Sequence, residues 1–110
     1  MANEPSPRDN IRNFIPKLIE MTDDVVFGDI WERPGLSKRD RSLMVVSALI
    51  ALGKERQMVG HFNRALDNGL TVDEIKEIIT HLAFYSGWPT AMTAATIFKE
   101  VVEKREGKAA

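Results

Sequence analysis

Residues 68–89 read NGLTVDEIKEIITHLAFYSGWP and hold the end of one helix, the whole of a second and the start of a third. The opening Asn-Gly pair is typical of a helix C-terminus. Thr71 and Glu74 form a capping box, the clearest helix start in the chain. An apolar face then recurs every three or four residues, as a core-facing helix requires, at Ile75, Ile78, Ile79 and Leu82. The Gly-Trp-Pro run ends this helix and begins the last one.

Earlier segments predict further helices and no strand. Ser37, with Asp40 three residues on, resembles a capping box and begins a helix that Gly53 interrupts. The next helix runs to about Asp67. Residues 8–21 are weakly helical, with Pro16 limiting their regularity.

A short helix is expected over residues 22–33, with Thr22 as its cap, before a Pro-Gly break. The fold class is therefore all-α, a compact bundle of about five to six helices. Length favours a single domain over residues 1–110, with residues 1–8 frayed.

Composition excludes several classes of function. The chain is 44% hydrophobic and 28% charged, which is ordinary for a soluble protein, and its net charge of −1 provides no basic field for nucleic acid. No apolar run approaches the roughly 18 residues of a membrane span, and the polar N-terminus lacks the core of a signal peptide. We therefore expect a cytoplasmic protein with neither a membrane nor a nucleic-acid partner.

The chain has no cysteine, so it has no disulfide, thiolate nucleophile or thiol redox couple. Its two histidines, His61 and His81, are too few to form a zinc site alone, and we expect no metal.

The helix between residues 43 and 52 is apolar on every side, which predicts burial on every side. A chain of 110 residues has little material to surround a helix completely. Phe84 also lies opposite the core face of its own helix. Both observations favour a homo-oligomer.

Two pairs of polar residues lie on the borders of apolar faces. Gln57 and His61 are four residues apart on one helix, and His81 and Tyr85 are four apart on another. If these borders face each other, the four groups converge on one small pocket, where an imidazole could donate or accept a proton near pH 7. The commoner alternative is that each histidine is a hydrogen-bonded structural residue. Arg41 similarly either lies on a solvated face or binds a carboxylate as its anchor.

The order of these motifs resembles the carboxymuconolactone decarboxylase family, whose fold is alkylhydroperoxidase D-like. The resemblance covers residues 27–101. Its elements are FGDIWERPGLSKRDRSL (27–43), the segment around His61, NGLTVDEI (68–75), and HLAFYSGWPTA (81–91) followed by an amphipathic helix.

The peroxidase branch of this family uses a Cys-x-x-Cys pair, a histidine four residues later and a glutamate on the preceding helix. The matching positions here are Lys54 and Gln57 for the cysteines, His61 for the histidine and Ser42 for the glutamate. Only the histidine is kept. Without a thiolate the peroxide chemistry has no nucleophile, so we expect no thiol peroxidase activity.

The chain looks closer to the branch that decarboxylates 4-carboxymuconolactone during aromatic-compound breakdown. That reaction needs no cofactor, and the resemblance implies a homo-hexamer. Its site must hold a carboxylate, stabilise an oxyanion and deliver a proton to carbon. The resulting hypothesis makes His61 the proton donor and His81 a second acid or an orienting group. The substrate-binding candidates are Arg41 for the carboxylate, Gln57 and Tyr85 for the lactone, and Phe62 and Trp88 for the apolar wall.

Two classes of function follow. One is a decarboxylase, or another lyase or isomerase, acting on a small lactone or keto acid. The other is a non-catalytic helical oligomer or small-molecule-binding module that has kept the fold and lost the chemistry.

Overall fold

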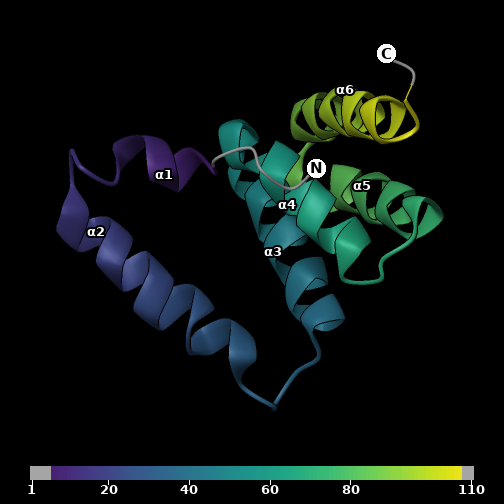
Figure 1. Cartoon of the computed structure of the whole chain (residues 1–110). Helices are drawn as coiled ribbons and strands as arrows, with labels where there is room; N and C mark the ends of the chain where they lie inside the picture. The colour runs from purple at the N-terminus through teal and green to yellow at the C-terminus, as the bar shows by residue number, and fades with distance from the viewer. Residues whose placement is uncertain (1–5, 108–110) are drawn as a thin grey trace. The chain divides into compact units, whose positions relative to one another are not determined.

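The computed structural model describes residues 6–107, which form helices and connecting turns and contain no strand (Figure 1). The predicted all-α fold is confirmed. Two compact units divide the chain, residues 1–36 and residues 37–110, and each is described by itself. The single domain over residues 1–110 stays a prediction. No helix within residues 6–107 combines the length and the apolarity needed to span a membrane.

The N-terminal unit consists of four short helical elements. These are α1 (Pro7–Ile11), α2 (Pro16–Met21), the π-helix η1 (Thr22–Phe27) and the 3₁₀-helix η2 (Ile30–Glu32). Residues 1–5 lie outside the described residues. Residues 6–8, which we expected to be frayed, instead cap and begin α1.

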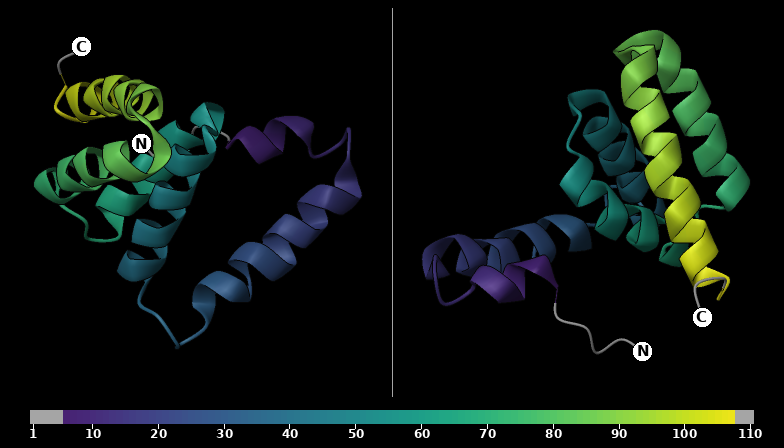
Figure 2. Two further views of the ribbon diagram at one scale, coloured as in Figure 1. Left: turned by 180° about the vertical axis from the view of Figure 1, so that it is seen from behind. Right: turned by 90° about the horizontal axis from the view of Figure 1, so that it is seen from above.

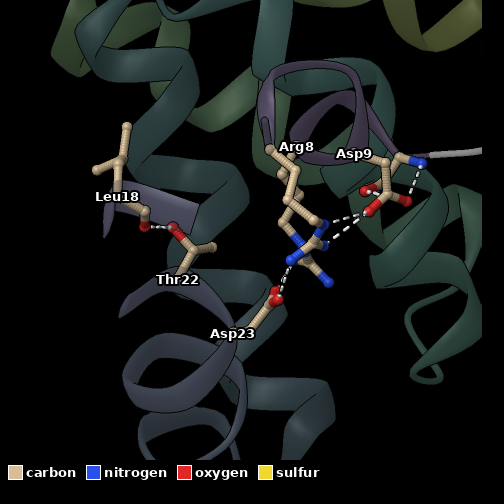
Figure 3. Close-up of polar contacts among 7 residues, drawn as sticks. Arg8, Asp9, Leu18, Thr22 and Asp23 are labelled. Carbon is tan, nitrogen blue, oxygen red and sulfur yellow. Dashed lines mark hydrogen bonds and ion pairs between the residues drawn. The ribbon is translucent and has the colours of Figure 1, made fainter. Parts of the chain in front are cut away.

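Two details of this unit differ from the sequence prediction. Pro16 begins a helix, because its missing N–H is not needed in the first turn. Thr22 is not a cap: η1 continues directly from α2, and the Thr22 hydroxyl donates to the Leu18 carbonyl at 2.8 Å (Figure 3). A helix already under way at Met21 presents no free N–H groups for Thr22 to cap.

An ionic cluster ties α1 to η1. Asp23 accepts from Arg12 at 2.6 Å and pairs with the Arg8 Nε at 3.1 Å, and Arg12 also reaches Asp9 at 2.7 Å (Figure 3). The Arg8 guanidinium also lies 4.5 Å from the centre of the Phe27 ring. These contacts hold a unit that has little apolar core of its own.

The C-terminal unit contains four longer helices: α3 (Lys38–Leu52), α4 (Glu55–Asp67), α5 (Val72–Ser86) and α6 (Trp88–Arg105). Both α3 and α6 pack against α4 and against α5, whereas α4 and α5 have little contact with each other. Figure 2 shows α5 and α6 side by side along their length.

The predicted helix ends of this unit are confirmed. The Ser37 hydroxyl accepts from the Asp40 backbone at 3.0 Å, and Thr71 and Glu74 form both bonds of a capping box. Gly53 ends α3 with φ of 69°, a left-handed conformation that glycine adopts without strain. The Asp40 carboxylate accepts from Arg39 and is therefore not the second half of a box.

Phe62 lies at the centre of the core. It is fully buried on α4, and its ring centre is 4.9 Å from that of Phe98 on α6. The other large apolar side chains that are fully buried are Val46, Ile50, Met58 and Ile75. Phe62 was expected to line a pocket; in the described structure it is fully buried in the core, and its role as a pocket wall stays a prediction.

α3 is buried along one face only, through Ser42, Val46 and Ile50. Its outer side exposes Met44 by 50% and Leu52 by 68%. The expected burial on every side is therefore wrong for a single chain. The apolar outer side of α3 is left for another surface to cover.

The capping box gives a test of how α5 begins. Thr71→Ala removes the acceptor for the Glu74 N–H and should lower the free energy of unfolding by about 1 kcal/mol. Urea denaturation monitored by circular dichroism measures the change. Thr96→Ala is the matched control, since its hydroxyl bonds the Met92 carbonyl inside α6 and caps nothing. Equal losses for the two variants would contradict the capping role.

Candidate functional site

His61 lies half-buried at the border of the core face of α4. At 100° per residue, Gln57, Arg64 and Asn68 share its flank of the helix. The Asn68 Nδ2 donates to the Ser42 Oγ on α3 at 3.0 Å. The flank that carries His61 therefore faces α3.

The opposite flank of α4 is occupied by α6. Arg105 donates to the Asn63 Oδ1 at 2.9 Å and pairs with Asp67 at 2.9 Å. Together with Phe62, these contacts set the rotation of α4, so that His61 cannot turn toward α6. The position of His61 beside α3 therefore follows from the packing of α4 against α3, against α6 and, through Phe62, against the core.

Burial lowers the pKa of His61, and the positive charge of Arg64 one turn away lowers it further. An imidazole whose pKa lies below the usual value of about 6.5 is neutral at pH 7. In this form His61 can accept a proton. A nearby anion raises its pKa, and the protonated imidazole can then donate that proton. His61 also has an interaction partner in the chain, so a structural contribution accompanies any chemical one.

Ser42 occupies the position where the peroxidase branch has its glutamate. It is buried with 1% exposure, and its hydroxyl accepts from Asn68. A hydroxyl in this place satisfies the amide but holds no charge and relays no proton near neutral pH. With Lys54 and Gln57 in the two cysteine positions, the residues needed for thiol peroxidase chemistry are absent from the chain.

His81 and Tyr85 lie on the outer part of α5, both exposed, with ring centres 5.1 Å apart and nearly parallel. His81 lines a groove of about 380 Å³ between α3 and α5. Its floor is apolar and its rim is polar, the full lining being Arg39, Leu43, Ser47, Glu74, Glu77, Ile78, His81 and Leu82. Neither Gln57 nor His61 belongs to this groove.

Gln57 and His61 on α4 therefore lie beside one flank of α3, and His81 and Tyr85 on α5 lie beside another flank. Ser42 faces α4, whereas Ser47 faces α5, and five residues correspond to about 140° around a helix. His61 is on the first side and His81 on the second. The structure of one chain keeps Gln57 with His61 and His81 with Tyr85 but does not bring the two pairs together.

The other expected site residues are also separate. Arg41 is half-buried and adjoins Ser42 near the start of α3. Trp88 is exposed at the start of α6, with its ring edge-on to Phe84 at 5.5 Å. Arg41 is thus near the N-terminal end of α3, and Trp88 lies beside the exposed Phe84 of α5.

Arg64 was missed by the sequence reasoning, although its spacing of three residues from His61 was visible. An arginine on a helix surface is usually a solvated charge, and only the packing of α4 on α3 shows that this one is half-buried beside the imidazole. Within residues 6–107, no group of three or more His, Cys, Asp or Glu side chains is arranged to hold a metal ion.

The fold, the retained histidine and the missing thiols can now be compared with known proteins. The model of the carboxymuconolactone decarboxylase family matches residues 16–100, which is most of the chain. The protein belongs to this family. The match crosses the boundary between the two compact units, so both contribute to the family region.

Two curated relatives are similar over 93 residues. The chain is 34% identical to 4-carboxymuconolactone decarboxylase of Acinetobacter baylyi, with 84% of this chain and 69% of that protein covered. It is 31% identical to the nitrosuccinic acid decarboxylase npaB of Metarhizium robertsii, with 81% of this chain and 65% of that protein covered. Both relatives are named as decarboxylases, on two different acids.

The lowered pKa of His61 makes stability depend on pH. The unfolded chain binds a proton at His61 below about pH 6.5, while the folded protein resists it, so this residue makes stability fall as pH drops below that value. His61→Gln should flatten this acid-side decline in chemical denaturation between about pH 5 and 7. His81→Gln should keep the part of the slope that His61 supplies. An unchanged slope in His61→Gln would contradict the burial argument.

Proposed function

We propose that this protein is a cofactor-free decarboxylase that removes carbon dioxide from a small carboxylated lactone such as 4-carboxymuconolactone. Its setting would be the cytoplasm and the breakdown of aromatic compounds. The observation that carries the proposal is the placement of His61, a half-buried imidazole on a flank with Gln57 and Arg64, in a chain without thiols. Family membership and two relatives named as decarboxylases support the class of reaction.

The proposed reaction breaks the bond between the carboxylate carbon and the ring. The electron pair stays on the ring carbon and spreads into the conjugated lactone, whose carbonyl oxygen becomes an oxyanion while carbon dioxide leaves. Protonated His61 then delivers its proton to carbon and returns to the neutral form. Gln57 would donate a hydrogen bond to the lactone oxygen, where it counts most as the negative charge develops.

Arg41 remains a proposed anchor for a carboxylate, because a guanidinium binds that group through two parallel N–H donors. His81, as a second acid or orienting group, and Tyr85 and Trp88, as further substrate contacts, would have to come from a neighbouring subunit. The proposal therefore includes a homo-oligomer, with a hexamer as its expected state. The exposed apolar side chains of α3, α5 and α6 support it, namely Met44, Leu52, Phe84, Trp88 and Met92.

A second reading is a non-catalytic binding module of the same family. The observation that favours it is the open groove beside His81, which has an apolar floor and does not include His61. A binding module would hold a small acid without changing it. Incubation with 4-carboxymuconolactone separates the two readings, because only the enzyme reading predicts loss of its ultraviolet absorbance.

The proton-donor role of His61 predicts the effect of replacing it. His61→Gln should reduce turnover of 4-carboxymuconolactone by about 10²–10⁴-fold, the usual contribution of a positioned acid or base. Glutamine keeps a hydrogen bond but supplies no proton near neutral pH. The spectrophotometric assay gives kcat, and binding of a non-reacting lactone carboxylate should change much less.

Asn63→Gln is a matched control, because Asn63 is two residues from His61 on the α6 flank of α4 and binds Arg105. It should retain turnover. Full activity in a folded His61→Gln protein would exclude His61 as the donor, and His81 would become the candidate. Loss of thermal stability with normal turnover per folded molecule would assign His61 a structural role.

The proposed assembly predicts a particle much larger than the 12.4 kDa chain. Light scattering of the purified protein should give about six times that mass at micromolar concentration. Leu52→Lys should lower it, because a charge on the exposed end of α3 opposes burial. Lys17→Glu, a charge change at a solvent-exposed residue of α2, is the control and should leave the mass unchanged.

Subunit mixing tests whether the neighbour completes the site. If His61 and Tyr85 act from different chains, co-assembly of inactive His61→Gln and Tyr85→Ala subunits should restore part of the activity. A stable 12.4 kDa monomer with full turnover would overturn both the assembly and the shared site.

A further inference from the structure

Arg64 lies one turn from His61 on the same flank of α4, and its charge acts on the imidazole. It follows His61 by three residues, which is about 4.5 Å along the helix axis. Side chains of a helix lean toward its N-terminus, so the Arg64 side chain leans toward His61. The through-space effect of its charge on His61 agrees with this placement.

The register of α3 against α4 separates Arg41 from His61. The helices run in opposite directions, joined by a short turn at Gly53 and linked at the far end by the bond from Asn68 to Ser42. Arg41 precedes Ser42 and so lies near the level of Asn68. That level is about 10 Å along α4 from His61, more than twice the separation of Arg64.

We propose that Arg64 binds a carboxylate of the substrate and couples the binding of that anion to protonation of His61. The inference rests on the proposed decarboxylation and assigns it a residue. Arg41, near the N-terminal end of α3, is then available for a second carboxylate. Both arginines have interaction partners in the chain, and the five N–H donors of a guanidinium allow a ligand to share them.

The chemistry requires such a coupling. Loss of carbon dioxide from a carboxylate leaves an anion that must gain one proton, and the proposed function assigns its delivery to His61. Free His61 is neutral at pH 7 and has no proton to give in that form. An anion on Arg64 offsets the arginine's charge and places a negative charge beside the imidazole, so His61 takes a proton from water as the substrate binds. After proton transfer to carbon, His61 is neutral again and the cycle closes.

The charged groups around His61 are consistent with this assignment. α4 contributes Arg64, whose charge acts on His61, and α3 carries Arg41 near its N-terminal end. α6 brings Arg105 to the opposite flank of α4, where Asn63 and Asp67 bind it. Arg64 is thus the charge that acts on His61 from within α4 itself.

NMR titration of the imidazoles with succinate as the probe tests the proposal without any turnover. The chain has two histidines, so His81→Gln assigns the signals. In the wild-type protein, succinate should raise the pKa of His61 relative to sodium chloride at equal ionic strength. Arg64→Gln should raise the pKa of His61 without succinate, abolish the further rise, and weaken succinate binding by about tenfold or more.

Arg56→Gln is the matched control. It removes the same charge from an exposed position on α4, five residues and about 140° around the helix from His61. It should titrate like the wild-type protein. Arg64→Lys keeps the charge and should retain part of the response to succinate, which separates a charge effect from a packing effect if Arg64→Gln is poorly folded.

Two results would overturn the proposal: a wild-type His61 titration that succinate does not change, or a succinate response that survives in Arg64→Gln. The proposed function fails separately. If 4-carboxymuconolactone is not turned over but succinate still raises the pKa of His61 through Arg64, the anion coupling stands and the decarboxylation falls.

Discussion

The contact between Phe62 and Phe98 is the constraint on which the candidate site depends. Burying an aromatic ring in the centre of a small unit leaves α4 one rotation, because any other would expose Phe62 and place polar neighbours in the core. His61 is the next residue back along α4, so this rotation puts it at the core border. There it is desolvated enough for its pKa to fall and open enough to meet a ligand. The position and the lowered pKa of His61 are therefore consequences of packing at Phe62.

The border between α3 and α4 is also where this chain differs from the pattern of the peroxidase branch, although the scaffold is shared. Where the peroxidase branch has cysteines and a glutamate, this chain has Lys54, Gln57 and Ser42. The Ser42 hydroxyl, held by Asn68, fills a buried polar position without charge. A site without a resident anion can accept one from solution, and Arg64 favours it. In the proposed function, the absence of a resident carboxylate and the binding of an acidic substrate are thus two aspects of one electrostatic arrangement.

Much of this fold was predictable, because helix starts and core faces are encoded by nearby residues. Thr71 with Glu74, and Ser37 with the Asp40 backbone, act within one helical turn. The errors arose where distant packing decides. Thr22 is not a cap, because α2 runs on into a π-helix, and the outer side of α3 is exposed instead of buried.

The candidate site was harder to predict for the same reason. Sequence spacing put His61 and His81 on similar borders of their own helices, but it holds no information on which side of α3 each border meets. Arg64 was visible as a neighbour of His61, yet its half-burial depends on α3. Residue spacing shows which side chains share one face of a helix. It does not show which face of a neighbouring helix they pack against, because that depends on the tertiary fold.

The apolar groups that remain exposed connect the site to assembly. α3 leaves one side uncovered, and the end of α5 presents two aromatic contacts, His81 with Tyr85 and Phe84 with Trp88, to solvent. Rings that already contact each other lose little side-chain freedom when a second surface covers them, so such a patch associates at a low entropic cost. Because α3 separates His61 from His81, only a residue from another chain can bring the α5 chemistry to His61. In the proposed mechanism, a role for both histidines therefore requires the oligomer, whereas the pairing of His61 with Arg64 is present in one chain.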